Sequence, residues 1–177
     1  MLSVGVNDYL AKVKKSLKGS EREIEPIFLI LQEAKRSGKN VWILGNGGSL
    51  AIAQHLAQDL LKLCGLKAQA INCPSVLTAY SNDDGFEYCL FNPLSKLAQE
   101  RDPILIFSCS GKSRNYIEFV SGFPHYKNPI LSVVGTDGGF LKSKSAFSVH
   151  VKSNDYQVCE TAFCVISDIL VKSLMEE

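Results

Sequence analysis

One stretch of the sequence, residues 41–63, restricts the fold more than any other. It begins with Val-Trp-Ile-Leu, passes through the glycine-rich segment 45–49, and ends in a run from Leu50 to Leu63 rich in Ala, Leu and Gln. A short β-branched and aromatic run predicts a buried strand, and a long run without Pro or Gly predicts a helix. The glycines allow a sharp turn and a close approach to a ligand. Because free N–H groups at a helix start point outward, the stretch predicts a site for an anion or a sugar.

The spacing of these glycines excludes two nucleotide-binding loops. The segment 45–49 does not fit the G-x-x-x-x-G-K-[ST] pattern of nucleoside-triphosphate loops, and it lacks the third glycine of a G-x-G-x-x-G pattern. A tight turn without a ligand is the alternative interpretation of this segment taken alone. Its position between a predicted strand and a predicted helix favours the ligand site.

The composition predicts a single globular domain. A chain of 177 residues suffices for a sizeable core, and 46% hydrophobic with 21% charged residues is typical of a folded protein. A formal net charge of +1 provides no electrostatic attraction to nucleic acid or to an anionic membrane. No apolar run approaches the roughly 20 residues that span a bilayer. We therefore expect no nucleic acid and no membrane among the partners.

Cysteine usage indicates the compartment. Six cysteines are spread along the chain without a Cys-x-x-Cys pair. The first turns carry Asn7, Asp8 and Lys12, which argues against a signal peptide. We therefore expect reduced and mostly buried cysteines in a cytoplasmic protein.

Strands and helices alternate along the chain. We expect strands at residues 41–44, 68–72, 103–107, 129–134 and 146–151, and the main later helices at 50–63, 86–100, 114–119 and 155–175. We expect the segment 75–85 to be irregular or a short helical turn. The alternation predicts a parallel sheet with right-handed crossovers, and nothing in the sequence indicates a linker or a repeat.

Two helices are predicted before the first strand. Apolar residues at helical spacing run over residues 4–17, and Gly19 ends that helix. Ser20 to Glu23 fits a capping box for the second helix, whereas Pro26 favours a start nearer Glu25. That helix is expected to end at Gly38.

The loop after the third predicted strand presents three hydroxyl groups around a glycine. Ser108, Ser110 and Ser113 stand at the end of a strand and the start of a helix. Hydroxyl and backbone N–H groups can together surround a phosphate. Alternatively, Ser108 or Ser110 only caps the helix. Lys112 either adds a positive charge or is a solvated turn residue.

Several motifs taken together resemble the sugar isomerase (SIS) domain family, and within it the phosphoheptose isomerase branch. They are Gly45-Asn46-Gly47-Gly48-Ser49 followed by Ala53-Gln54-His55, then Asn82-Asp83, Ser108-x-Ser110-Gly111-x-Ser113, and Gly135-x-Asp137-Gly138-Gly139. The resemblance covers nearly the whole chain. It implies an α/β fold, a three-layer α/β/α sandwich with a five-stranded parallel, flavodoxin-like sheet. It also implies one SIS domain over residues 1–177, in which the helical pair 1–38 packs at the interface of a homotetramer.

The resemblance also implies an activity. Phosphoheptose isomerases convert sedoheptulose 7-phosphate to a heptose 7-phosphate, which serves bacterial lipopolysaccharide or capsule synthesis. By the same resemblance, a phosphorylated sugar is the ligand and the active sites lie between subunits. The implied substrate-binding residues are Asn46, Gly47, Gly48, Ser49, Asn82, Asp83, Ser108, Cys109, Ser110 and Ser113, with Cys109 where the family usually has Thr.

The departures from the family pattern fall on the implied metal and catalytic residues. His55 matches a metal-binding histidine, but Asp59 stands where the family has a Glu that serves as metal ligand and base. A gapless match of the last helix places Glu160 and Asp168 at a family Gln and His, while a shifted match places Gln157 and Val165 there. The candidate catalytic residues are therefore Asp59, Glu160 and Asp168, and the candidate metal ligands are His55, Asp59, Glu160 and Asp168.

The implied cofactor is one divalent metal ion. The family resemblance favours Zn²⁺, whereas one histidine with three carboxylates is a harder donor set that suits Mg²⁺ or Mn²⁺. Isomerisation through an enediol needs a base near the migrating proton and a group that stabilises the developing oxyanion. We expect a sugar-phosphate isomerase in which Asp59 or Glu160 is the base. The alternatives are a non-catalytic module that binds a phosphosugar or a protein partner, and a structural subunit of a mixed oligomer.

Overall fold

The computed structural model of the protein describes residues 3–123 and 127–176. The terminal residues 1–2 and 177 of the predicted domain lie outside these ranges. Along the chain, the helices and strands are α1 (Val6–Ser16), α2 (Glu21–Ser37), β1 (Asn40–Leu44), α3 (Gly48–Cys64), β2 (Lys67–Ala70), α4 (Pro74–Asp83), η1 (Phe86–Tyr88), α5 (Phe91–Leu97), β3 (Ile104–Ser108), α6 (Arg114–Gly122), β4 (Ile130–Val134), α7 (Gly139–Lys144), β5 (Phe147–His150) and α8 (Tyr156–Met175).

The five strands form one parallel sheet in the order β2-β1-β3-β4-β5. This is the strand order of flavodoxin-like folds, and it confirms the predicted sheet. β3 is central, and all five of its residues are buried. Because β1 and β3 are adjacent, the loops that follow them open at the same edge of the sheet.

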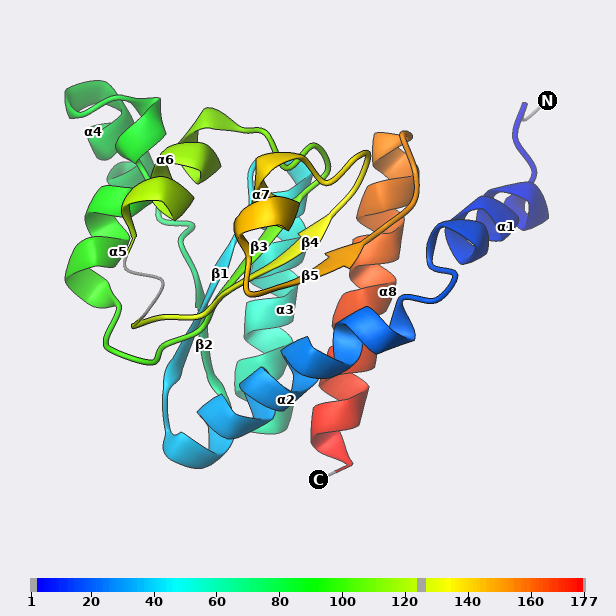
Figure 1. The fold of residues 1–177 in the computed structure, drawn as a ribbon, viewed down its shortest axis with the longest axis horizontal. Helices are drawn as coiled ribbons and strands as arrows, with labels where there is room; N and C mark the ends of the chain where they lie inside the picture. Colours follow the sequence, from blue (N-terminus) through cyan, green and yellow to red (C-terminus); the bar gives the residue numbers. More distant parts are fainter. Residues whose placement is uncertain (1–2, 124–126, 177) are drawn as a thin grey trace.

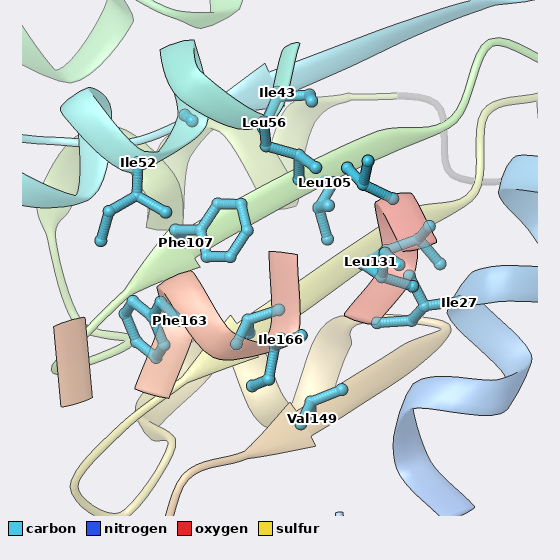
Figure 2. Close-up of a cluster of buried hydrophobic side chains, with 14 of the residues drawn as sticks. Ile27, Ile43, Ile52, Leu56, Leu105, Phe107, Leu131, Val149, Phe163 and Ile166 are labelled. Carbon is cyan, nitrogen blue, oxygen red and sulfur yellow. The ribbon is translucent and has the colours of Figure 1, made fainter. Parts of the chain in front are cut away.

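Helices cover both faces of the sheet, as the predicted three-layer sandwich requires (Figure 1). Alternate residues of each strand point to opposite faces. Ile43, Leu105 and Phe107 pack against α2, α3 and α8, and Figure 2 shows this core with the rings of Phe107 and Phe163 close together. Their ring centroids lie 5.6 Å apart. The residues of opposite parity form a second core with α5, α6 and α7.

Helix α2 has Ser20 as its N-cap residue, as the capping-box position predicts, but the start nearer Glu25 and the side-chain cap are wrong. Helix α2 begins at Glu21, and Pro26 lies inside it. Ser20 makes no side-chain cap; its hydroxyl donates instead to the carbonyl of Leu17 at 2.6 Å. The Ser20 side chain is therefore bonded to the end of α1 and does not cap the N–H groups of α2.

The segment between β2 and β3 is more helical at its start and more broken later than expected. Residues 75–85 mostly belong to the ten-residue helix α4, which has Pro74 at its first position. The expected helix 86–100 is divided into the short helix η1 and α5. Pro93 lies in the first turn of α5, where its missing N–H group removes no hydrogen bond.

Helix α1 extends away from the sheet layers and reaches the molecule's edge beside α8 (Figure 1). The hydroxyls of Tyr9 and Thr161 lie 3.1 Å apart and connect the two helices. Val6 is 73% exposed and Leu10 54%, so α1 presents apolar side chains to solvent. In the described part of the chain, no helix combines the length and apolar character that a membrane span needs.

Candidate active site

A small pocket of about 150 Å³ lies at the carboxyl edge of the sheet. The loops after β1 and β3 and the first turns of α8 meet there. Its lining residues are Asn46, Ser49, Phe107, Ser108, Cys109, Ser110, Ser113, Tyr116, Tyr156 and Glu160. The structure therefore brings together most of the predicted substrate-binding residues and one predicted catalytic residue, Glu160. We call this the serine pocket.

The loop after β3 folds tightly on its own hydroxyl groups. Ser108 Oγ accepts from the N–H of Gly111 at 3.0 Å, and Ser110 Oγ accepts from the N–H of Lys112 at 3.2 Å. Gly111 has φ +63°, and a Cβ there would collide with the carbonyl of Gly138. The residue at the N-cap of α6 is Ser113, whose side chain makes no capping hydrogen bond. The helix-cap interpretation of Ser108 and Ser110 is therefore not what the loop shows.

The glycine turn after β1 brings the start of α3 directly beneath a carboxylate. Gly48 is the first residue of α3, and a Cβ at this position would collide with the carboxylate of Glu160. A larger residue at this position would require the Glu160 side chain to move. Glu160 is the one carboxylate among the described residues that line the serine pocket.

Asn46 in the glycine turn makes a reciprocal pair with a residue that sequence reasoning missed. Each carboxamide of Asn46 and Asn115 donates one hydrogen bond to the other, both at 3.0 Å. Asn115 lies in the first turn of α6 and is fully buried. Its position two residues after Ser113 was the only available sequence signal.

Cys109 replaces the usual hydroxyl residue with a buried thiol. A hydrogen bond with Cys159 and burial raise the pKa of Cys109, so its thiol is neutral at pH 7. Cys109 Sγ lies 3.9 Å from the carbonyl oxygen of Tyr156. The thiol is thus directed at α8, and Tyr156 is a further pocket residue that the sequence did not single out.

Lys112 is paired with the loop after β4. Its ammonium group lies 2.7 Å from the carboxylate of Asp137, and this hydrogen bond lowers the pKa of Asp137. Both side chains are exposed. The neighbouring carboxylate therefore partly neutralises the one positive charge in the Ser108–Ser113 segment.

The candidate metal ligands are divided between two places. His55, Asp59 and Asp168 line a second pocket of about 120 Å³ between α3 and α8, together with Cys164. His55 Nε2 lies 3.3 Å from Asp59 Oδ2. Glu160 lies in the serine pocket. Eight residues of helix separate Glu160 from Asp168, a distance of about 12 Å along the helix axis, so the two carboxylates do not meet.

No group of three or more His, Cys, Asp or Glu side chains within residues 3–123 and 127–176 is arranged to hold a metal ion. The four predicted ligands therefore do not form one coordination site within a single chain. The bound metal stays a prediction.

Asn82 and Asp83 lie at the end of α4, where Asn82 Nδ2 donates to Asp83 Oδ1 at 2.8 Å. Both are exposed, and neither lines the serine pocket. A larger neighbouring pocket of about 540 Å³, lined in part by Asn46, Ser81 and Ser113, opens toward this helix. The structure thus leaves the Asn82-Asp83 pair outside the group of residues around the glycine turn.

Comparison with known proteins gives consistent results at the level of sequence. The family model described as "SIS domain" matches residues 6–124. The phosphoheptose isomerase of Helicobacter pylori is 33% identical over 150 residues, covering 81% of this chain and 78% of that protein. The phosphoheptose isomerase of Geobacter metallireducens is 30% identical over 177 aligned residues, covering 92% of this chain and 94% of that protein.

Solved structures show the same fold. A phosphoheptose isomerase from Francisella tularensis superposes with a TM-score of 0.89 at 22% identity, covering 97% of this chain and 94% of that chain. One from Neisseria gonorrhoeae gives a TM-score of 0.89 at 21% identity, covering 97% and 95%. These similarities extend over both N-terminal helices and the whole sheet.

Proposed function

The chain belongs to the SIS domain family, and from that premise we propose that it is an isomerase of phosphorylated sugars. The observation that supports this proposal best is the serine pocket. It combines hydroxyl and backbone N–H groups suited to a phosphoryl group, a glycine turn beside it, and one carboxylate within the same small space. The substrate that the relatives suggest is sedoheptulose 7-phosphate, interconverted with a heptose 7-phosphate.

In the proposed reaction, Glu160 is the base. Its carboxylate removes a proton from the carbon next to the carbonyl group, the electron pair of that C–H bond forms an enediol, and the proton returns to the neighbouring carbon. A hydroxyl proton moves between the two oxygens, so the reaction has no net oxidation. Asp59 is less suitable because it lies with His55 in the second pocket.

The residues that hold the phosphoryl group have a separate task. Ser108, Ser110 and Ser113, with the N–H groups at the start of α6, fix one end of the substrate. Fixing the substrate places the reacting carbons near Glu160, and a misplacement of about 1 Å can reduce the rate on the order of 100-fold. These serines and N–H groups, which we call the serine cradle, therefore contribute to the rate by positioning the substrate and not by transferring a proton.

A Zn²⁺ ion would supply Lewis-acid polarisation of the carbonyl oxygen. The four candidate ligands do not fit one site within the chain, since Glu160 is separated from His55, Asp59 and Asp168. We therefore assign no step of the reaction to a metal ion.

We further propose a cytoplasmic homotetramer that serves lipopolysaccharide or capsule heptose synthesis. The support is the family relationship together with the exposed apolar side chains of α1. Such side chains on one helix are typical of a surface that another subunit covers.

The second candidate function is a phosphosugar-binding module without catalysis. The observation that favours it is the position of Asp59 and Asp168 outside the serine pocket. In that case the pocket would bind ligand, and Glu160 would be a pocket wall rather than a base.

A coupled assay over phosphorylated ketoses of five to seven carbons separates these functions. We expect turnover by the wild type, and a loss of about 10²- to 10⁴-fold in kcat for Glu160→Gln, because general-base catalysis contributes that much. Asp59→Asn tests the other candidate base, and its loss of kcat should be much smaller than that of Glu160→Gln. Ligand-induced thermal stabilisation without turnover of any substrate would support the binding module instead.

A further inference from the structure

A buried amide pair connects the two loops of the serine pocket. Asn46 belongs to the glycine turn after β1, and Asn115 to the first turn of α6, directly behind Ser113. The two hydrogen bonds between their carboxamides are both 3.0 Å long. The loop that would hold the phosphoryl group is thereby tied to the loop that would contact the sugar.

Asn115 itself makes no contact with the pockets. It is 0% exposed and lines neither the serine pocket nor the larger neighbouring pocket. Its amide nitrogen also faces Cys89 Sγ at 4.0 Å. A buried carboxamide destabilises the fold unless its polar atoms have hydrogen-bond partners, and the carboxamide of Asn46 supplies partners for both polar atoms of the Asn115 side chain.

Asn46 is only partly buried and lines both pockets. A carboxamide offers two N–H donors and two acceptor lone pairs. The pair with Asn115 uses one donor and one acceptor of Asn46. One donor and one acceptor of Asn46 remain for a ligand in these pockets, which suits a hydroxyl-bearing carbon chain, since each hydroxyl both donates and accepts.

We propose that Asn115 is a positioning residue: it fixes the carboxamide of Asn46, which the family resemblance already implies as a substrate contact, in the orientation that meets the sugar. The inference rests on the proposed function of the serine pocket. It predicts that Asn115 affects the binding of a sugar phosphate more than the binding of phosphate alone, because only the sugar carries the hydroxyl-bearing chain that the Asn46 carboxamide would contact.

The test compares two ligands by isothermal titration, inorganic phosphate and sedoheptulose 7-phosphate. Asn115→Leu keeps the size of the side chain and removes both hydrogen bonds. We expect its affinity for the sugar phosphate to fall about five- to tenfold, the effect of one lost hydrogen bond, and its affinity for inorganic phosphate to stay within about twofold. Should Asn115→Leu fail to fold, Asn115→Asp, which keeps an acceptor but loses the donor, takes its place.

A double-mutant cycle distinguishes positioning from a general structural effect. If Asn115 acts through Asn46, adding Asn115→Leu to Asn46→Ala causes no further loss of sugar-phosphate affinity. The matched control is Asn128→Leu, another buried amide, whose Nδ2 donates to the carbonyls of Gln99 and Asp102. This control should lower the melting temperature and leave both affinities unchanged.

Three outcomes overturn the inference. Equal losses for both ligands, an unchanged sugar-phosphate affinity, or additive losses in the cycle would each show that Asn115 does not position Asn46. A wild type that binds no inorganic phosphate would contradict the serine cradle, and with it the proposed function. The failure of the inference and the failure of the function are thus separate results.

Discussion

Glu160 and the three serines give the serine pocket one carboxylate and three hydroxyl groups. A carboxylate beside a phosphoryl group is unfavourable, and the neighbouring Lys112 is already paired with Asp137. Hydroxyl groups and backbone N–H groups must therefore provide the attraction. Binding should depend on individual serine hydroxyls more than on the lysine.

We expect Ser110→Ala to weaken the binding of inorganic phosphate about 10- to 150-fold, because a hydrogen bond to a charged group contributes about 1.5–3 kcal/mol. Isothermal titration measures this change. Ser143→Ala is the matched control, since Ser143 Oγ donates to the carbonyl of Phe140 on the exposed side of α7. An unchanged affinity for Ser110→Ala would remove this serine from the cradle.

The same reasoning gives an expectation for metal removal. The proposed cradle consists of hydroxyl and N–H groups and needs no cation to bind phosphate. Incubation with a chelator should therefore leave the phosphate-induced rise in melting temperature unchanged. A rise that disappears with the chelator and returns with Zn²⁺ would show that a metal ion takes part in binding.

At this scale the sequence allowed only part of the site to be predicted. The serines and Asn46 follow from motif and position, since loops after adjacent parallel strands meet at one edge. Which of Asp59 and Glu160 lies near the serines did not follow from the sequence, because it depends on how α3 and α8 pack. Asn115 was missed because a buried amide has no pattern of its own along the chain.

At the scale of elements, buried polar contacts hold the strands at the end opposite the pocket. Asp102 is fully buried just before β3. Its carboxylate accepts from the backbone N–H of Asn40 at 3.0 Å, from Trp42 Nε1 at 3.2 Å and from the N–H of Gln99 at 2.9 Å. It therefore joins the starts of β1 and β3.

We expect Asp102→Ala to lower the free energy of unfolding by about 3 kcal/mol or more, because four donors, the Nδ2 of Asn40 included, lose their partner and each unsatisfied buried group costs about 1–3 kcal/mol. Urea denaturation measures the loss. Asp83→Ala, at an exposed position on α4, should stay within about 0.5 kcal/mol of the wild type. Equal stabilities for the two variants would contradict the role given to Asp102.

The predicted strands matched the structure because their apolar runs are short and bounded by Gly, Pro or polar residues. Errors fell where local chemistry allowed two states. Ser20 is the N-cap residue of α2, but its hydroxyl donates to the carbonyl of Leu17 at the end of α1 instead of accepting from α2. The full length of helix α4 was not predicted because its many polar residues leave no apolar stripe along it, and none of its residues is buried.

At the scale of the whole molecule, the exposed apolar side chains of α1 are left uncovered by the described part of the chain. The exposure of Val6 and Leu10 to water is unfavourable. A groove of about 760 Å³, lined in part by Leu10, Leu17 and Val165, lies on the same helix. A second subunit would bury these side chains. The layered sheet, by contrast, forms its two cores within one chain.

We expect light scattering after size exclusion to give a mass above that of the 19.4 kDa chain. A double variant with Lys in place of Val6 and Leu10 should contain more monomer than the wild type, because burying two charges at an interface is unfavourable. The far-ultraviolet circular dichroism should stay unchanged. A wild type that is already monomeric would contradict the proposed assembly.

If Glu160 removes and returns a carbon-bound proton of a phosphorylated sugar, deuterium from the solvent enters the substrate at that carbon. Sedoheptulose 7-phosphate in D₂O, followed by nuclear magnetic resonance, should gain deuterium at the carbon next to the carbonyl with wild-type protein. Glu160→Gln should still bind inorganic phosphate but incorporate no deuterium above the uncatalysed rate. Equal incorporation by Glu160→Gln and the wild type, or none by the wild type while it binds the sugar phosphate, would contradict the account.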